Sequence, residues 1–243
     1  MLMQPGIPGA NGAGRRGAAA PGVHTKDVAR VIAGEAGGRR LAVPDGRNTR
    51  PTSDRAREGL FATIVSMVGS LTGTRVLDLY AGSGAVGLEA LSRGAEHVLL
   101  VESQARAGRV IRENIEAIGL AGAEVVTDRV ERVLARGPAP SADGGRYDIV
   151  FADPPYALPG EEVSGMLMAL ADRGWLAPGA LVIVERATRS GPVSWPAGFV
   201  PDRARRYGEA TFWYARGRGG LGGTVPPQDR GGPRGGRPPG REH

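Results

Sequence analysis

Residues 75–87 read Arg-Val-Leu-Asp-Leu-Tyr-Ala-Gly-Ser-Gly-Ala-Val-Gly, and this stretch decides how the chain folds. An apolar run ends at Tyr80, and Gly82, Gly84 and Gly87 follow with the spacing G-x-G-x-x-G. Glycines at this spacing let the backbone approach a ligand and let a helix pack closely on a strand. The stretch therefore predicts a strand, a ligand-binding loop and the start of a helix. A tight turn without a ligand is the structural alternative.

Strands and helices alternate after this loop. Strands are predicted at 75–80, 97–102, 123–127, 147–152 and 180–185, helices at 85–93, 104–118, 130–135 and 161–173, and a closing hairpin at 203–207 and 210–214. Near-continuous apolar strands, such as Leu-Val-Ile-Val at 181–184, are typical of a parallel sheet that helices cover on both faces. The pattern predicts an α/β fold in which ligands bind at the carboxyl ends of the strands.

The two ends of the chain differ from the rest in composition. Residues 1–24 and 217–243 are rich in Gly and Arg and hold few large apolar residues, so they cannot offset the entropy cost of folding. We expect both to be disordered tails. The folded domain is expected at 25–216, with a small β-hairpin and a helix at 25–70 and the α/β core at 71–216.

Composition excludes several classes of protein. The 243 residues include no cysteine, which excludes disulfides, zinc knuckles and thiolate catalysis. No stretch resembles a membrane span or a secretory signal. We expect a cytoplasmic protein without a metal site, and a monomer because no unexplained apolar surface stretch is present.

Two carboxylates follow the next two strands, where a nucleotide cofactor needs acceptors. Glu102 ends the second strand, 15 residues after Gly87, and can accept both hydroxyls of a ribose. Asp128 follows the third strand and can accept from the amine of an adenine. The structural alternatives are a solvated acid for Glu102 and a helix cap or loop residue for Asp128. NAD and S-adenosylmethionine fit Glu102 equally well.

The tetrapeptide Asp153-Pro154-Pro155-Tyr156, directly after the fourth strand, separates these cofactors. The prolines remove two backbone donors and leave carbonyls free to point into a cleft. Asp153 adds a carboxylate, and Tyr156 adds a ring on which a flipped base can stack. Two acceptors on an exocyclic amine aim its lone pair at a methyl sulfonium. The motif indicates amine methylation, and a rigid turn is the structural alternative.

The glycine loop at 76–84 and the tetrapeptide at 153–156 resemble the cofactor loop and catalytic motif of Rossmann-like amino-methyltransferases. Segments nearer the amino terminus narrow the resemblance to the bacterial 16S ribosomal RNA guanine-N2 methyltransferase family. They are Arg-Val-Ile-Ala-Gly at 30–34, Gly-Arg-Arg-Leu-Ala-Val-Pro at 38–44 and Thr-Arg-Pro-Thr-Ser-Asp-Arg-Ala-Arg-Glu at 49–58. Gly-Trp-Leu-Ala-Pro-Gly at 174–179 and Tyr207-Gly208 are also similar. The resemblance spans about residues 28–216.

This resemblance implies a class I methyltransferase with a seven-stranded, mostly parallel sheet, an antiparallel last strand, and S-adenosylmethionine as cofactor. By position, it implies that the target amine is held by Asp153, Pro154, Pro155 and Tyr156. The cofactor contacts that it implies are Asp78, Tyr80, Gly82, Ser83, Gly84, Glu102, Asp128, Thr49, Arg50, Pro51 and Thr52. Asp128 is followed by Arg-Val, a less typical context in the family.

Arginines suggest how RNA would be held. Residues 26–57 contain eight Lys and Arg against four Asp and Glu, and arginine offers fork-shaped donors to phosphate. A solvated charged surface is the structural alternative, and local acids are alternative partners for Arg55 and Arg57. The candidate RNA contacts are Arg39, Arg40, Arg47, Arg55, Arg57, Arg205 and Arg206.

The function predicted from the sequence is methylation of a guanine N2 amine in 16S ribosomal RNA, within a 30S subunit or an assembly intermediate. Methylation of adenine N6 in DNA or RNA is the second enzymatic reading, since the tetrapeptide permits it. A non-catalytic RNA-binding module and an NAD oxidoreductase are the alternatives from other classes. The intact Glu102 and tetrapeptide argue against the module, and nothing in the chain resembles the catalytic residues of the oxidoreductase.

Overall fold

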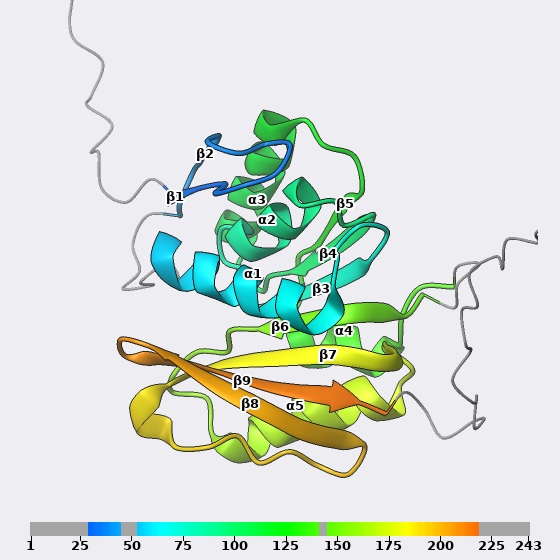
Figure 1. Cartoon of the computed structure of the whole chain (residues 1–243). Helices are drawn as coiled ribbons and strands as arrows, with labels where there is room; N and C mark the ends of the chain where they lie inside the picture. Colours follow the sequence, from blue (N-terminus) through cyan, green and yellow to red (C-terminus); the bar gives the residue numbers. More distant parts are fainter. Residues whose placement is uncertain (1–28, 45–52, 141–144, 219–243) are drawn as a thin grey trace, which may run out of the picture.

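The computed structural model describes residues 29–44, 53–140 and 145–218 (Figure 1). Its main element is a seven-stranded sheet with the order β5-β4-β3-β6-β7-β9-β8. The strands are β3 (Arg75–Leu79), β4 (His97–Val101), β5 (Ala123–Val126), β6 (Tyr147–Ala152), β7 (Leu176–Ala187), β8 (Phe199–Tyr207) and β9 (Ala210–Gly217). β3 to β7 are parallel, and β9 runs antiparallel to both of its neighbours. The predicted mostly parallel sheet with an antiparallel last strand is confirmed.

Helices cover both faces of this sheet (Figure 1). Alternate residues of each strand point to opposite faces, so Val76 packs in one apolar cluster and Leu77 in the other. The first cluster includes residues of α1 (Asp54–Val68), α2 (Ala85–Ser92) and α3 (Ala105–Ile118). The second includes residues of α4 (Val130–Arg136) and α5 (Gly160–Asp172). The chain is therefore an α/β protein with a Rossmann-like, three-layer fold.

The predicted elements differ from the observed ones mainly near the carboxyl end. β7 begins at Leu176 rather than 180, and its pairing with β6 shifts register between Tyr147 and Ile149. β8 begins at Phe199, four residues earlier than predicted, and β9 continues to Gly217, one residue past the expected end of the domain. The expected tail at 1–24, most of the tail at 217–243, and 45–52 lie outside the described residues. No helix in the described ranges has the length and apolarity to cross a bilayer.

A two-stranded hairpin precedes the core. β1 (Ala29–Arg30) pairs antiparallel with β2 (Arg40–Leu41), so the predicted hairpin is present but short. The buried Glu89 of α2 holds the connection between these strands, because its carboxylate accepts from Ile32 N at 2.6 Å and Ala33 N at 3.1 Å.

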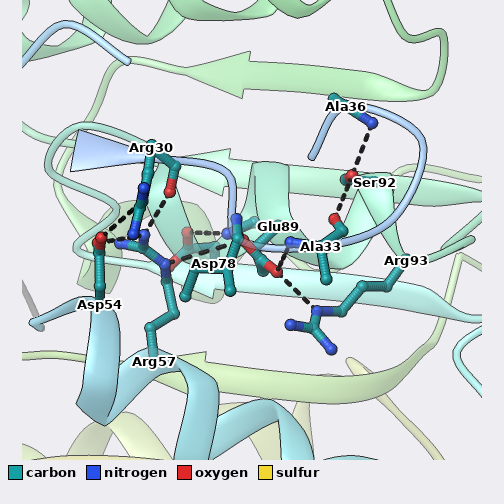
Figure 2. A network of polar contacts seen from close by, with 11 residues as sticks. Arg30, Ala33, Ala36, Asp54, Arg57, Asp78, Glu89, Ser92 and Arg93 are labelled. Carbon is teal, nitrogen blue, oxygen red and sulfur yellow. Dashed lines mark hydrogen bonds and ion pairs between the residues drawn. The ribbon is translucent and has the colours of Figure 1, made fainter. Parts of the chain in front are cut away.

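Arg57 joins the same carboxylate to α1 (Figure 2). Its side chain is only 1% exposed, with Nε 3.9 Å from Glu89 Oε2 and Nη2 3.0 Å from Asp54 Oδ1. Nη2 also donates to the carbonyl of Arg30. RNA has no access to this guanidinium, so the expectation that Arg57 contacts RNA is wrong. A buried arginine needs a nearby carboxylate and hydrogen-bond acceptors, and the interior network supplies both.

This network fixes α1 over the sheet. Ser53 caps the helix, since its Oγ accepts from Ala56 N at 3.2 Å. Leu60, Phe61 and Ile64 of α1 then pack in the same cluster as Phe212 and other residues of the sheet. The hairpin, α1 and α2 are thus joined through one buried carboxylate.

We expect Glu89→Ala to lower the free energy of unfolding by about 3–5 kcal/mol, because two partly buried N–H groups and Arg93 lose their acceptor and the buried Arg57 loses a neighbouring negative charge. Chemical denaturation measures the change. The matched control is Glu116→Ala on the exposed side of α3, which we expect to stay within about 0.5 kcal/mol of the parent protein. Equal stability of the two variants would contradict the role given to Glu89.

Candidate active site

The glycine loop lies between β3 and α2 at the carboxyl edge of the sheet. Gly82 and Gly84 have φ values of 59° and 78°, and Tyr80 has a φ of 61°, which is unusual for a residue with a side chain. The loop is held by hydrogen bonds from Ala81 N to Val101 O at 3.0 Å and from Gly84 N to Ala81 O at 2.7 Å. The left-handed residues turn the backbone sharply and leave it close to the edge where ligands bind.

Asp78, in β3, stabilises this loop through a hydrogen bond to the backbone that follows it. It is 2% exposed, and its Oδ2 accepts from Gly87 N at 2.9 Å, so the carboxylate faces the loop backbone rather than the cleft. Burial raises the pKa of Asp78 to about 7, and the neighbouring Glu102 adds to the effect. Gly87 must be small, since a Cβ there would lie 2.8 Å from Val98 Cγ1. The third glycine of the motif therefore serves helix packing.

Glu102 connects the glycine loop to the end of β4. Its Oε2 accepts from Gly82 N at 3.0 Å and its Oε1 from Gln104 N at 2.8 Å. The side chain is 7% exposed and lies where the sequence analysis expects a ribose-binding carboxylate. A carboxylate has about four acceptor positions, so each oxygen keeps acceptor capacity for a ligand hydroxyl.

Asp128 lies on the loop after β5, as predicted, but arginines surround it. It accepts from Arg129 N at 2.8 Å and forms ion pairs with Arg136 at 2.5 Å and Arg132 at 3.8 Å. The hydrogen bond from Arg129, followed by that from Arg136, lowers the pKa of Asp128. Exposed ion pairs are weak, so Asp128 can exchange an arginine for a ligand donor at little cost.

The tetrapeptide follows β6 and borders the glycine loop. Asp153 N donates to Leu79 O at 3.3 Å, which joins the start of the tetrapeptide to the end of β3, just before the loop. Leu158 N donates to the carbonyl of Pro155 at 2.8 Å, whereas no residue that the structure describes donates to the carbonyl of Pro154. Pro154 is buried and Tyr156 is 45% exposed. An acceptor pair and an exposed ring thus lie at this edge.

A second carboxylate, Glu185, lies beside Asp153. Ala152 pairs with Val184 in the sheet, so the following residues of β6 and β7 are neighbours on the face that α1 covers. Burial, followed by the charges of Glu185 and Asp78, raises the pKa of Asp153 well above its usual range. Glu185 is not among the site residues predicted from the sequence. A charged residue at the end of a buried apolar strand was the signal that could have found it.

Arg186, next to Glu185, points to the other face of the sheet. It is 7% exposed, and its Nη2 donates to Leu158 O at 2.8 Å. This hydrogen bond anchors the turn that follows the tetrapeptide. Its charge also opposes the rise in the pKa of Asp153. The described residues contain no group of three or more His, Asp and Glu side chains that could hold a metal ion.

The other predicted site residues fall in three places. Ser83 lies in the glycine loop, where its carbonyl accepts from Asn114 Nδ2 at 2.9 Å. Arg39 is exposed but donates to the carbonyls of Ala117 and Ile118 at the end of α3. Arg40 in the hairpin and Arg55 in α1 are exposed and have no such structural role. Arg205 and Arg206 are exposed on β8. Arg47, Thr49, Arg50, Pro51 and Thr52 lie outside the described residues.

Comparison with known proteins agrees with this geometry. The family described as Conserved hypothetical protein 95 matches residues 29–216. Ribosomal RNA small subunit methyltransferase D of Escherichia coli is 35% identical over 185 residues, which cover 75% of this chain and 87% of that protein. The protein of the same name from Haemophilus influenzae is 32% identical over 164 residues, 67% of this chain and 80% of that one.

Solved structures of similar proteins share the fold. The yhhF protein of Escherichia coli has a TM-score of 0.68 and 32% identity, covering 79% of this chain and 99% of its own. The Thermus thermophilus protein TTHA0928 has a TM-score of 0.63 and 34% identity, covering 77% and 98%. The chain therefore belongs to the ribosomal RNA small subunit methyltransferase D family, which the match to Conserved hypothetical protein 95 also supports.

Proposed function

We propose that this protein transfers a methyl group from S-adenosylmethionine to the exocyclic N2 amine of a guanine in 16S ribosomal RNA. The observation that carries the proposal is the contact between the tetrapeptide and the end of β3, where the glycine loop begins: Asp153 N donates to Leu79 O. It brings acceptors for an amine next to a loop suited to a nucleotide cofactor. Relatives named for ribosomal RNA methylation support the substrate.

The site suits this cofactor in two respects. Glu102 offers acceptors for ribose hydroxyls beside the glycine loop, and Asp128 offers one for the adenine amine. Asp78, Asp153 and Glu185 lie on one face of three adjacent strands, with Asp78 two residues before the level of the other two. A group of carboxylates favours a cationic ligand. S-adenosylmethionine carries such a cation in its sulfonium, so the carboxylates suit the methyl donor.

In the proposed reaction, the lone pair of guanine N2 attacks the methyl carbon of the cofactor. A C–N bond forms, the C–S bond breaks, and its electron pair stays on sulfur to give S-adenosylhomocysteine. The Asp153 carboxylate and the Pro154 carbonyl accept from the two N–H groups and so direct the lone pair, while Tyr156 stacks on the base. The methylated nitrogen then loses a proton to Asp153 or to water.

The carboxylates also favour guanine over adenine. The edge of guanine next to N2 carries a second donor, N1–H, whereas the matching position in adenine is an acceptor. An ionised carboxylate that faces this position has no proton to share with the adenine nitrogen, which is unfavourable. Adenine-N6 methylation remains the second candidate because the tetrapeptide itself suits either amine.

The RNA would contact arginines that stay exposed around this edge. Arg40, Arg55, Arg205 and Arg206 are available, and Arg39 is available in part, since its guanidinium also caps α3. We propose a 30S subunit or an assembly intermediate as the physical substrate, a monomeric enzyme, and the cytoplasm as its location. Arg47, Thr49, Arg50, Pro51 and Thr52 keep their proposed roles in binding RNA or bordering the cofactor.

Incubation of the purified protein with labelled S-adenosylmethionine and 30S subunits that lack the modification should give labelled N2-methylguanosine. Nucleoside mass spectrometry identifies the product, and naked 16S RNA runs in parallel. Label in N6-methyladenosine would replace guanine by adenine as the target. No label in either nucleoside, with cofactor binding intact, would contradict RNA methylation.

Asp153→Ala should lower kcat by about 100-fold or more, because it removes an acceptor aimed at the reacting nitrogen. Binding of S-adenosylmethionine, measured by calorimetry, should persist because the glycine loop and Glu102 are unchanged. The matched control is Asp172→Ala, at the exposed end of α5, with kcat expected to be unchanged. Parent-like activity of Asp153→Ala would exclude the assigned role.

The affinity for S-adenosylmethionine should rise between about pH 6 and about pH 8. Asp78, with a pKa of about 7, is mostly protonated at the lower pH. A bound cation favours the ionised form and lowers this pKa, so linkage makes binding tighter as pH rises through 7, by at most about tenfold for one proton. Asp153, whose pKa is also raised, acts in the same direction.

S-adenosylhomocysteine is the matched ligand, since it lacks the sulfonium charge. Calorimetry should give it a weaker pH dependence than S-adenosylmethionine, and Asp78→Asn should reduce the difference between the two ligands. The same pH dependence for both ligands in the parent protein would show that the carboxylates do not act on the sulfonium.

A further inference from the structure

A groove of about 350 Å³ separates α1 from the edge strand β8. On the helix side it is lined by Gly59, Ala62, Thr63 and Ser66, which lie on one face because they are spaced by three or four residues. All four side chains are small and uncharged, so α1 leaves room above the strand. Tyr207 packs against Gly59, since a Cβ at 59 would lie 2.4 Å from the Tyr207 hydroxyl and would displace that ring.

Arginines form the strand side of the groove. Arg203, Arg205 and Tyr207 alternate along β8 and point to the same face, toward α1. Arg203 Nε pairs with Asp202 at 2.6 Å, whereas Arg205 makes no hydrogen bond or ion pair within the part of the chain that the structure describes. Neither the helix side nor the strand side contributes a carboxylate to the lining. The groove therefore has a positive charge that the described residues only partly balance.

The register of the sheet connects the groove to the candidate active site. Arg205 pairs with Phe212, which pairs with Glu185, the neighbour of Asp153. The four residues thus form one row, and three strand spacings place Arg205 about 14 Å from Asp153. β8 runs in the same direction as β6, so the Tyr207 end of the groove lies at the edge of the sheet where the tetrapeptide begins. A short length of RNA backbone bridges such a separation.

We infer that this groove holds the phosphate backbone of the RNA strand next to the target base, with Arg203 and Arg205 as phosphate contacts. The inference rests on the proposed function, because it takes the ligand to be the methylated RNA. Arginine forks match phosphate geometry, and backbone contacts on either side of an extruded base fix its position. The small residues of α1 leave space for sugar and phosphate between the helix and the arginines.

The arginines of an edge strand also have a purely structural explanation, since charge on an exposed edge prevents sheets from joining. The two roles predict different results. Protection of the edge predicts that loss of the arginines causes association of the protein without a change in RNA affinity. Phosphate binding predicts a change in both the affinity for RNA and its dependence on salt.

The test compares Arg203→Ala/Arg205→Ala with Arg146→Ala/Arg173→Ala, a control that removes two exposed charges before the amino ends of β6 and β7. Binding of a naked 16S RNA transcript is measured over a range of salt concentrations. The groove variant should lose affinity, and its slope of log affinity against log salt should fall by about 2, one unit for each phosphate contact. On 30S subunits its KM should rise at unchanged kcat. The control should match the parent protein.

Ala62→Glu provides a second test that keeps both arginines. Ala62 is exposed on α1, and glutamate is well tolerated in helices, so the variant should fold. A carboxylate in the groove should repel phosphate and weaken RNA binding as the double variant does. Parent-like affinity and salt slope in both variants would overturn the inference, as would association of the double variant with unchanged RNA binding. Cofactor affinity should stay constant throughout.

These outcomes are independent of the methylation assay. If the parent protein methylates no guanine but the groove variants lose RNA affinity, the proposed function fails and the groove remains an RNA-binding surface. If the parent protein methylates guanine and the groove variants bind and react normally, the groove inference alone fails.

Discussion

The remaining structure depends on the hydrogen bonds and ion pairs of the buried Glu89 carboxylate. It accepts from the backbone between β1 and β2 and lies beside the guanidinium of Arg57, so the hairpin, α1 and α2 are fixed relative to one another. α2 begins at the glycine loop, and α1 forms one wall of the basic groove. The positions of the cofactor loop and of the groove therefore share one internal anchor. Loss of Glu89 would leave the buried Arg57 without this neighbouring negative charge, so the hairpin, α1 and α2 depend on one another.

Carboxylates at the edge of the sheet show how position changes the role of one chemical group. Glu102 accepts from loop N–H groups and keeps acceptor capacity for a ligand, whereas Asp78 is enclosed beneath the loop and supports it. Asp153 lies between Glu185 and Asp78, and the three charges disfavour one another in a site with little water. In the proposed function, the sulfonium of the methyl donor relieves that repulsion.

Sequence patterns predicted the strands of the core, the glycine loop and the tetrapeptide, because each depends on residues that are adjacent in the chain. Contacts between distant segments were harder to predict. Arg57 was predicted to lie on the surface. It is buried because Glu89, 32 residues later in the chain, lies beside it in the fold. Glu185 gained significance from its register beside Asp153. β8 and β9 are longer than predicted because they pair with each other as far as Phe199 and Gly217.

The strand order has a consequence for the order in which the molecule assembles. β8 precedes β9 in the chain, but β9 lies between β7 and β8, so β8 has no partner in the sheet until residues 210–217 have been synthesised. The glycine loop and the tetrapeptide belong to strands that pair earlier. On a translating ribosome, the nascent protein would complete its catalytic edge first and its basic groove last. The groove between α1 and β8 is therefore completed only after both strands of the closing hairpin have been synthesised.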